Sequence, residues 1–262
     1  MLVAVFAVSF AAAALISARV LPSRMLAAPR VAPSSAHAGA SPAALPPALD
    51  IRGLTPLSDP VGVTHWAPVL RTTVARRAPS LKAAPAGLLP THTPDGTTNI
   101  VVARGESVVA GKAWVRVGLS VLPNGTQGWV PRSSLGGWSF VDTRLVIDRA
   151  RFTAILLRAG RIVFRAPIGV GAPGTPTPAG QFYVRDRLTG FSSPMYGALA
   201  FGTNARSPTL TDWPGGAVVG IHGTNQPGLI PGRISHGCIR LTNAAIVRLG
   251  QLMPVGTPVT IE

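Results

Sequence analysis

Residues 234–241 read ISHGCIRL and contain the only cysteine of the 262-residue chain. This cysteine, Cys238, follows His236 by two positions, with Gly237 between them. In a β-strand, residues i and i+2 project from the same face, so we expect the imidazole and the thiol to meet. A histidine beside a thiol can take its proton and favour the nucleophilic thiolate. The stretch therefore predicts a cysteine nucleophile, and the alternative is a buried, unreactive core cysteine.

The sequence around this stretch resembles the active-site signature of L,D-transpeptidase catalytic domains of the YkuD type. Four stretches carry the resemblance: SHGC at 235–238, GIHGT at 220–224, GTPTPAGQF at 174–182 and PMYG at 194–197. The resemblance covers about residues 142–262. One departure concerns the position two residues after the cysteine, where many members carry asparagine and this chain has Arg240, as another part of the family does.

The resemblance implies acyl transfer in two steps on a peptidoglycan stem peptide. Cys238 would attack the carbonyl between the third residue and the fourth, D-alanine, which leaves while a thioester remains. His236 would take the thiol proton and later serve the leaving and incoming amines. Backbone N–H groups of Gly237 and Cys238 are the expected oxyanion donors. The residues expected to bind substrate or to orient the site are His222, Ser235, Arg240, Gly223 and Tyr196.

Three of these residues could have either a functional or a purely structural role. His222 could line the cleft, bind a substrate carboxylate or fix the geometry around the thiol, or it could be a histidine satisfied within the fold. Arg240 could hold the substrate carboxylate and favour the thiolate, or it could be a structural ion-pair partner. Ser235 could orient the imidazole or be a polar residue at a strand end.

Other functions share parts of this pattern. Water in place of an acceptor amine would make the protein an L,D-carboxypeptidase, and an inactive domain would leave a non-catalytic cell-wall-binding protein. A zinc site built from His222, His236 and Cys238 lacks a second ligand pair with characteristic spacing. We therefore expect no metal and no cofactor.

The sequence predicts four regions. Residues 1–20 are uncharged up to Ala18 and apolar, which indicates an export signal or an N-terminal membrane anchor. Residues 21–65 are rich in Ala and Pro and predict a flexible linker. We expect a small β domain at 66–140 and the catalytic domain at 141–262. The predicted location is extracytoplasmic, in the cell envelope.

The chain is strongly basic, with a formal net charge of +15 from 24 Lys and Arg against 9 Asp and Glu. Such a charge favours an anionic cell wall or membrane surface as partner, and a general preference for arginine would also produce it. No recognised nucleic-acid motif is present, so we expect no nucleic-acid partner.

The fold class that we predict is mainly β. In residues 66–140, short β-rich runs alternate with turn signals, and the Trp114 strand with Gly128-Trp129-Val130 resembles bacterial SH3-like barrels. Trp114 and Trp129 either contact wall glycan or peptide, or fill the barrel core. The second domain is expected to be an L,D-transpeptidase-type β-sandwich or barrel with one main helix, capped by Thr242 or Asn243.

Overall fold

The computed structural model describes residues 62–210 and 217–262. The predicted export signal or anchor and nearly all of the predicted linker fall on residues 1–61, outside the described residues. Among the helices of the described residues, none is long and apolar enough to cross a membrane.

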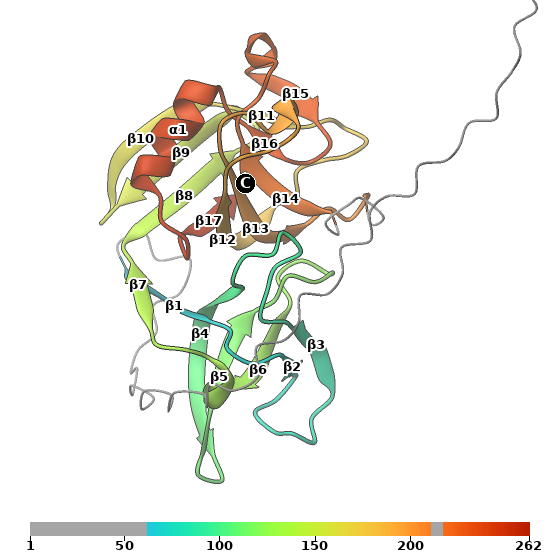
Figure 1. The fold of residues 1–262 in the computed structure, drawn as a ribbon, viewed down its shortest axis with the longest axis vertical. Helices are drawn as coiled ribbons and strands as arrows, with labels where there is room; N and C mark the ends of the chain where they lie inside the picture. Colours follow the sequence, from blue (N-terminus) through green and yellow to red (C-terminus); the bar gives the residue numbers. More distant parts are fainter. Residues whose placement is uncertain (1–61, 211–216) are drawn as a thin grey trace, which may run out of the picture. The chain divides into compact units, whose positions relative to one another are not determined.

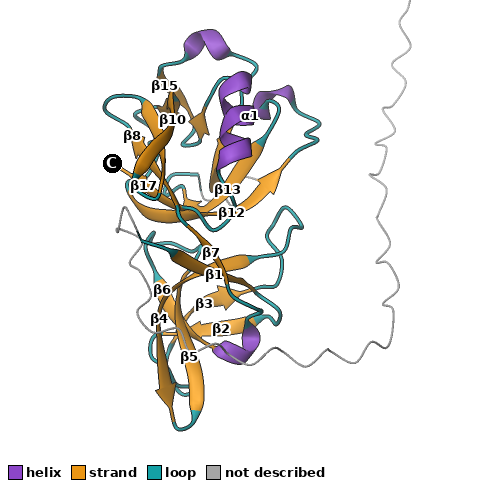
Figure 2. Cartoon of the chain, turned by 90° about the vertical axis from the view of Figure 1, so that its left-hand side faces the viewer, coloured by secondary structure: helices purple, strands orange, loops and turns teal. Residues whose placement is uncertain are grey.

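The described chain is mainly β-structure with a single α-helix, as the sequence predicts (Figures 1 and 2). The helix is α1 (Asn243–Leu252), and three short 3-10 helices are η1 (Arg132–Ser134), η2 (Pro194–Tyr196) and η3 (Pro227–Leu229). The strands are β1 (Thr64–Pro68), β2 (Thr73–Arg76), β3 (Pro85–Leu89), β4 (Ile100–Val109), β5 (Lys112–Gly118), β6 (Gln127–Pro131), β7 (Ser139–Val141), β8 (Thr143–Asp148), β9 (Thr153–Arg158), β10 (Arg161–Pro167), β11 (Gly169–Gly171), β12 (Gly180–Leu188), β13 (Ala200–Arg206), β14 (Val218–His222), β15 (Gly232–Ser235), β16 (Ile239–Arg240) and β17 (Pro258–Ile261).

The first seven strands form one sheet in the order β3-β2-β6-β5-β4-β1-β7. Its core consists of small and branched apolar side chains, among them Val101, Val117 and Val130. Trp114 is only 3% exposed. Trp129 is half-buried, and the Arg116 guanidinium lies 5.9 Å from its ring centroid. Burial therefore favours a core role for Trp114 and leaves part of Trp129 accessible.

The other ten strands form a second sheet in the order β10-β9-β8-β17-β12-β13-β14-β16-β11-β15. Its first hairpin is encoded locally. Strands β9 and β10 alternate buried and more exposed side chains, and the turn between them places Ala159 and Gly160 at φ angles of 46° and 76°. Positive φ at both central residues is the geometry of the tight hairpin turns that suit the twist of antiparallel strands.

Helix α1 has the predicted start and the predicted apolar face. The Thr242 hydroxyl accepts a hydrogen bond from the Ala245 N–H at 3.2 Å, which satisfies one of the free donors of the first turn. Ile246 and Leu249 are fully buried in the core of the second sheet. Figure 1 shows α1 beside β9 and β10.

The order of the central strands brings two distant segments of sequence together. β14 pairs in parallel with β16, so that His222 lies opposite Arg240. β16 also pairs with β11, where Gly169 lies opposite Arg240. The GIHGT stretch and the end of the SHGCIR stretch thus become neighbours in the sheet, although 16 positions separate His222 from Cys238.

Candidate active site

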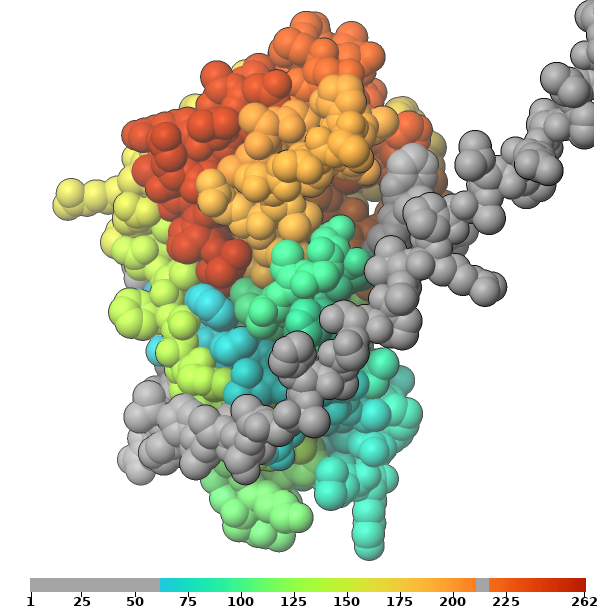
Figure 3. Space-filling view, viewed as in Figure 1, coloured from blue at the N-terminus to red at the C-terminus, as the bar shows by residue number. Residues whose placement is uncertain are grey.

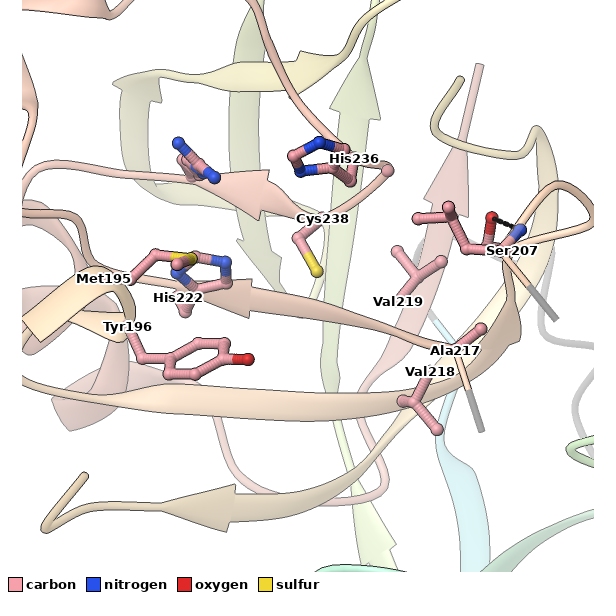
Figure 4. A pocket seen from close by; sticks show the side chains of 12 residues that line it. Met195, Tyr196, Ser207, Ala217, Val218, Val219, His222, His236 and Cys238 are labelled. Carbon is pink, nitrogen blue, oxygen red and sulfur yellow. Dashed lines mark hydrogen bonds between the residues drawn. The ribbon is translucent and has the colours of Figure 1, made fainter. Parts of the chain in front are cut away.

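A pocket in the second sheet collects most of the predicted site residues. Its lining includes Met195, Tyr196, His222, His236 and Cys238. Figure 4 shows the Cys238 sulfur pointing into this space, with His222 and Tyr196 on one side of it and Val219 on the other. The predicted residues Gly237 and Arg240 also line the pocket.

The cysteine lies in a turn, which corrects the expectation that it shares a strand with His236. Strand β15 ends at Ser235 and β16 begins at Ile239. Between them Gly237 has a φ of 119°, a conformation that side chains with a Cβ rarely adopt. The same-face rule for residues i and i+2 assumes a continuous strand, so its premise fails here.

The Ser235 hydroxyl stabilises this turn both as a hydrogen-bond donor and as an acceptor. Its Oγ donates to the Cys238 carbonyl at 2.6 Å and accepts from the Gly237 N–H at 3.1 Å. The Gly237 N–H is therefore engaged within the turn. Of the two backbone donors predicted for an oxyanion, the Cys238 N–H is the better candidate.

Two threonines about sixty positions earlier support the same turn. The Thr177 hydroxyl donates to the Gly237 carbonyl at 2.8 Å and accepts from the Gly171 N–H at 2.8 Å. The Thr175 hydroxyl donates to the Ser235 carbonyl at 3.2 Å. Figure 3 shows orange segments, which the colour bar places near residue 200, against the red C-terminal segments. In the sequence, the GTPTPAGQF stretch carries only the family resemblance, and no pattern gave Thr177 a role.

The Cys238 thiol is partly buried and accepts one backbone hydrogen bond. The Gly220 N–H points at Sγ, with 3.4 Å between nitrogen and sulfur. Burial raises the pKa of the thiol, and this effect is opposed by the Gly220 N–H and by the positive charge of Arg240. The resting group is therefore a thiol that needs a base to become a nucleophile.

His222 has the environment of such a base. It is 2% exposed, and its Nδ1 lies 2.6 Å from the Gly223 carbonyl oxygen. A carbonyl can only accept, so Nδ1 carries the proton and Nε2 is left with a free lone pair. Burial lowers the pKa of His222 to about 4, which the Gly223 hydrogen bond opposes and the Arg240 charge supports. The ring is thus neutral near pH 7.

The imidazole of His222 and the thiol of Cys238 both lie next to Gly220. A Cβ built on Gly220 would be 3.8 Å from Cys238 Sγ and also 3.8 Å from His222 Cδ2, the ring carbon next to Nε2. His236, in contrast, is exposed. In Figure 4 the sulfur points away from the His236 ring. Of the two histidines, His222 therefore has the better geometry for accepting the thiol proton.

Arg240 brings an uncompensated charge to the pocket. It is 7% exposed, and its Nε is buried without a hydrogen-bond partner among the described residues. A buried guanidinium whose Nε is unused is suited to a carboxylate, since arginine can bind such a group through two parallel hydrogen bonds. Among residues 62–210 and 217–262, no carboxylate forms an ion pair with Arg240.

Asn243, which the sequence indicated only as a possible helix cap, joins the two segments that carry Tyr196 and Gly223. Asn243 Oδ1 accepts from the Ala198 N–H at 3.3 Å and from the Thr224 N–H at 3.2 Å. It thereby ties the η2 loop to the turn that follows His222. The Tyr196 ring meets the His222 ring edge-on, with 5.2 Å between centroids. No pattern in the sequence indicated this role of Asn243.

Residues 142–261 match the family model YkuD, the L,D-transpeptidase catalytic domain. Among curated proteins, the putative L,D-transpeptidase YkuD of Bacillus subtilis is 36% identical over 110 residues, covering 42% of this chain and 60% of that protein. The protein of the same name from Bacillus licheniformis is 32% identical over 121 residues, which are 46% of this chain and 66% of that protein. The chain spans less than two thirds of the length of these relatives.

Among solved structures, the NMR structure of the catalytic domain from the E. faecium L,D-transpeptidase is 28% identical. The match covers 46% of this chain and 97% of the solved chain, with a TM-score of 0.35. The family model and the curated relatives support a YkuD-type L,D-transpeptidase catalytic domain over residues 142–261.

Proposed function

We propose that this protein is a peptidoglycan L,D-transpeptidase that works through a thioester on Cys238. The observation that carries the proposal is a partly buried thiol next to a buried, neutral imidazole whose tautomer is fixed by the Gly223 carbonyl. The match of residues 142–261 to the family model supports the proposed substrate class, a stem peptide of the cell wall. His222 takes the base role first predicted for His236.

In the first half-reaction, Nε2 of His222 accepts the thiol proton as Sγ of Cys238 attacks the carbonyl between the third stem residue and D-alanine. The carbonyl becomes a tetrahedral oxyanion. Its collapse breaks the C–N bond, and the imidazolium returns the proton to the departing amine of D-alanine. A thioester between the stem peptide and Cys238 remains.

The oxyanion needs a donor that no other group uses. The Gly237 N–H donates to Ser235 Oγ, so the proposal assigns the oxyanion to the Cys238 N–H. Thr177 and Ser235 act as positioning residues, because they hold the carbonyl and amide groups of the turn in the orientation that this donor requires.

Arg240 is assigned to the carboxylate of the substrate. The C-terminal carboxylate of D-alanine is the anionic group closest to the scissile bond, and the buried guanidinium offers it the unused Nε donor. The same positive charge favours the thiolate that forms during attack.

In the second half-reaction, His222 takes a proton from the acceptor amine as the amine attacks the thioester. The thiolate leaves and is protonated again by the imidazolium. Water in the acceptor position would give hydrolysis, the L,D-carboxypeptidase outcome. The two outcomes differ only in which nucleophile reaches the thioester.

The N-terminal sheet is proposed to be an SH3-like module that holds the enzyme at the wall. Its support is the half-buried Trp129 with Arg116 over its ring, a surface suited to a sugar or peptide, together with the net charge of +15. The proposal includes export to the cell envelope, since its substrate lies there, with the N-terminal segment as signal or anchor.

The test uses the full chain and a disaccharide tetrapeptide, with products read by mass spectrometry. We expect release of D-alanine and a cross-linked dimer, and a covalent carbapenem adduct on the wild type that Cys238→Ala lacks. Arg161→Gln, at an exposed position outside the pocket, serves as the control and keeps both activities. An adduct that persists in Cys238→Ala would contradict the proposed nucleophile, and free tripeptide without dimer would assign hydrolysis.

A further inference from the structure

A second buried arginine lies outside the candidate active site. Arg185, on β12, is 5% exposed, and its Nε is buried without a hydrogen-bond partner among the described residues. The described residues also contain no ion pair to its guanidinium. Burying a cation without a partner is costly, so such groups are normally paired or bind an ion. The mechanism proposed above does not use Arg185.

Arg185 lines a cavity of about 420 Å³ between the two sheets, which belong to one compact unit. The walls of this cavity are well fixed. The Tyr183 hydroxyl donates to the Gly118 carbonyl at 2.9 Å. Asn124 and Arg206 exchange two hydrogen bonds, with Arg206 N–H donating at 2.9 Å and the Asn124 amide donating at 2.7 Å. The cavity is therefore a preformed site with room for a small ligand.

The lining of the cavity contains further hydrogen-bond donors beside Arg185. The Ser120 hydroxyl lines it and is also buried without a hydrogen-bond partner among the described residues. Arg206 lines it as well, and its pKa is lowered by burial and by the positive charge of Arg185. The Arg206 Nε donates to the Ser120 carbonyl at 2.7 Å. The unused groups are therefore those of Arg185 and Ser120, and a buried guanidinium beside an unused hydroxyl is a site that a negatively charged group would stabilise.

The two carboxylates near Arg185, Asp186 and Asp95, form no ion pair with it. Asp186 uses its two oxygens to accept from the Gly202 N–H at 2.8 Å and from the Thr97 hydroxyl at 3.2 Å. Asp95 is exposed, and although its charge and that of Arg185 act on each other, it makes no ion pair with the guanidinium. The lining of the cavity also includes the apolar residues Leu88, Leu89, Pro90 and Val121.

We propose that this cavity is a second binding site, separate from the Cys238 pocket, for a small organic oxyanion with an apolar flank. Arg185 and Ser120 would bind the charged oxygens, and the wall of Leu88, Leu89 and Val121 would contact the apolar part. A planar guanidinium suits both a carboxylate and a phosphate ester. The site does not depend on the transpeptidase proposal, because it shares no residue with the Cys238 pocket.

The experiment measures binding to the full chain by calorimetry, with N-acetyl-leucine and glycerol 3-phosphate as probes. We expect the wild type to bind at least one probe, and the tighter probe assigns the ligand as a carboxylate or as a phosphate ester. Arg185→Gln should weaken binding roughly 10–100-fold, the effect of one lost hydrogen bond to a charged group. Arg161→Gln, which removes the same charge at an exposed position, should bind like the wild type.

Ser120→Ala keeps the test decisive if Arg185→Gln does not fold. This variant removes one hydroxyl and no charge, and it should weaken the same probe several-fold with an unchanged melting temperature. Failure of the wild type to bind either probe at millimolar concentration would overturn the proposal. Binding that stays unchanged in both Arg185→Gln and Ser120→Ala would also overturn it.

Discussion

The candidate active site joins two segments of opposite character. β14 is buried and presents His222 with its Nδ1 proton held by the Gly223 carbonyl. The turn between β15 and β16 carries Cys238 together with the exposed His236. The histidine closest to the cysteine in sequence has the less suitable environment. Burial, a fixed tautomer and a direction toward the sulfur identify the base better than sequence spacing does.

The sharpest test of this contrast replaces each histidine by glutamine. His222→Gln should lower kcat/KM for acyl transfer about 10²–10⁴-fold, the range for loss of a general base. Glutamine keeps an N–H that can donate to the Gly223 carbonyl, so the fold should persist. His236→Gln should cost less than about tenfold, since its ring is not assigned to proton transfer. Steady-state kinetics decide the order, and a larger loss in His236→Gln would reverse our assignment.

The depressed pKa of His222 predicts a dependence of stability on pH. Its pKa of about 4 in the folded protein lies below the ordinary histidine pKa of 6.5, so the unfolded chain binds the extra proton first as the pH falls. The contribution to folding stability is complete above about pH 6.5 and is lost as the pH falls toward about 4, on the order of 3 kcal/mol in all. Urea unfolding at several pH values measures it. His222→Gln should lack this component, and equal pH dependence in both proteins would contradict the assignment.

Substitutions of Arg240, on β16, test whether this residue binds the substrate. Arg240→Gln should lower kcat/KM about 10–100-fold, mainly through KM, because a charge-assisted hydrogen bond to substrate is lost. Arg240→Lys should recover part of this loss, because it restores the charge without the planar pair of donors. A change in kcat with KM unaltered would indicate that Arg240 acts on the thiol and does not bind the substrate carboxylate.

The smallest effect on activity is expected from Thr177, which supports the turn that carries Cys238. Thr177→Val keeps the shape and removes the hydrogen bonds to Gly171 and Gly237. We expect a loss of about 1–3 kcal/mol in unfolding free energy, because two buried backbone groups lose their partner. The carbapenem acylation rate should fall several-fold. Thr175→Val, at a longer contact of 3.2 Å, is the milder comparison. Unchanged stability and acylation in Thr177→Val would show that the turn keeps its conformation without the Thr177 hydrogen bonds.

Local signals in the sequence predicted the elements that depend on neighbouring residues. The β9–β10 hairpin follows from Ala159-Gly160, and α1 follows from the Thr242 cap and its apolar spacing. The parallel pairing of β14 with β16 joins segments that no local pattern relates. The sequence therefore named His222 and Cys238 as site residues without predicting how they meet.

The errors at the site have the same physical origin. The expectation for His236 assumed a strand where Gly237 makes a turn, and a positive φ at a single glycine is not visible in a motif. The tautomer of His222 depends on where the Gly223 carbonyl points, which is a matter of three-dimensional geometry. The roles of Thr177 and Asn243 likewise depend on backbone groups far from them in sequence.

The hydrogen bond from Thr177 to the Gly237 carbonyl has a consequence for dissection of the protein. A fragment that begins at β12 would contain both the GIHGT and the SHGC stretches in full. It would nevertheless lack the hydroxyl that holds the cysteine turn, as well as β11, which flanks β16. Supplying residues 142–179 as a separate peptide should then restore acylation, so that reactivity reports the reassembly of the split domain.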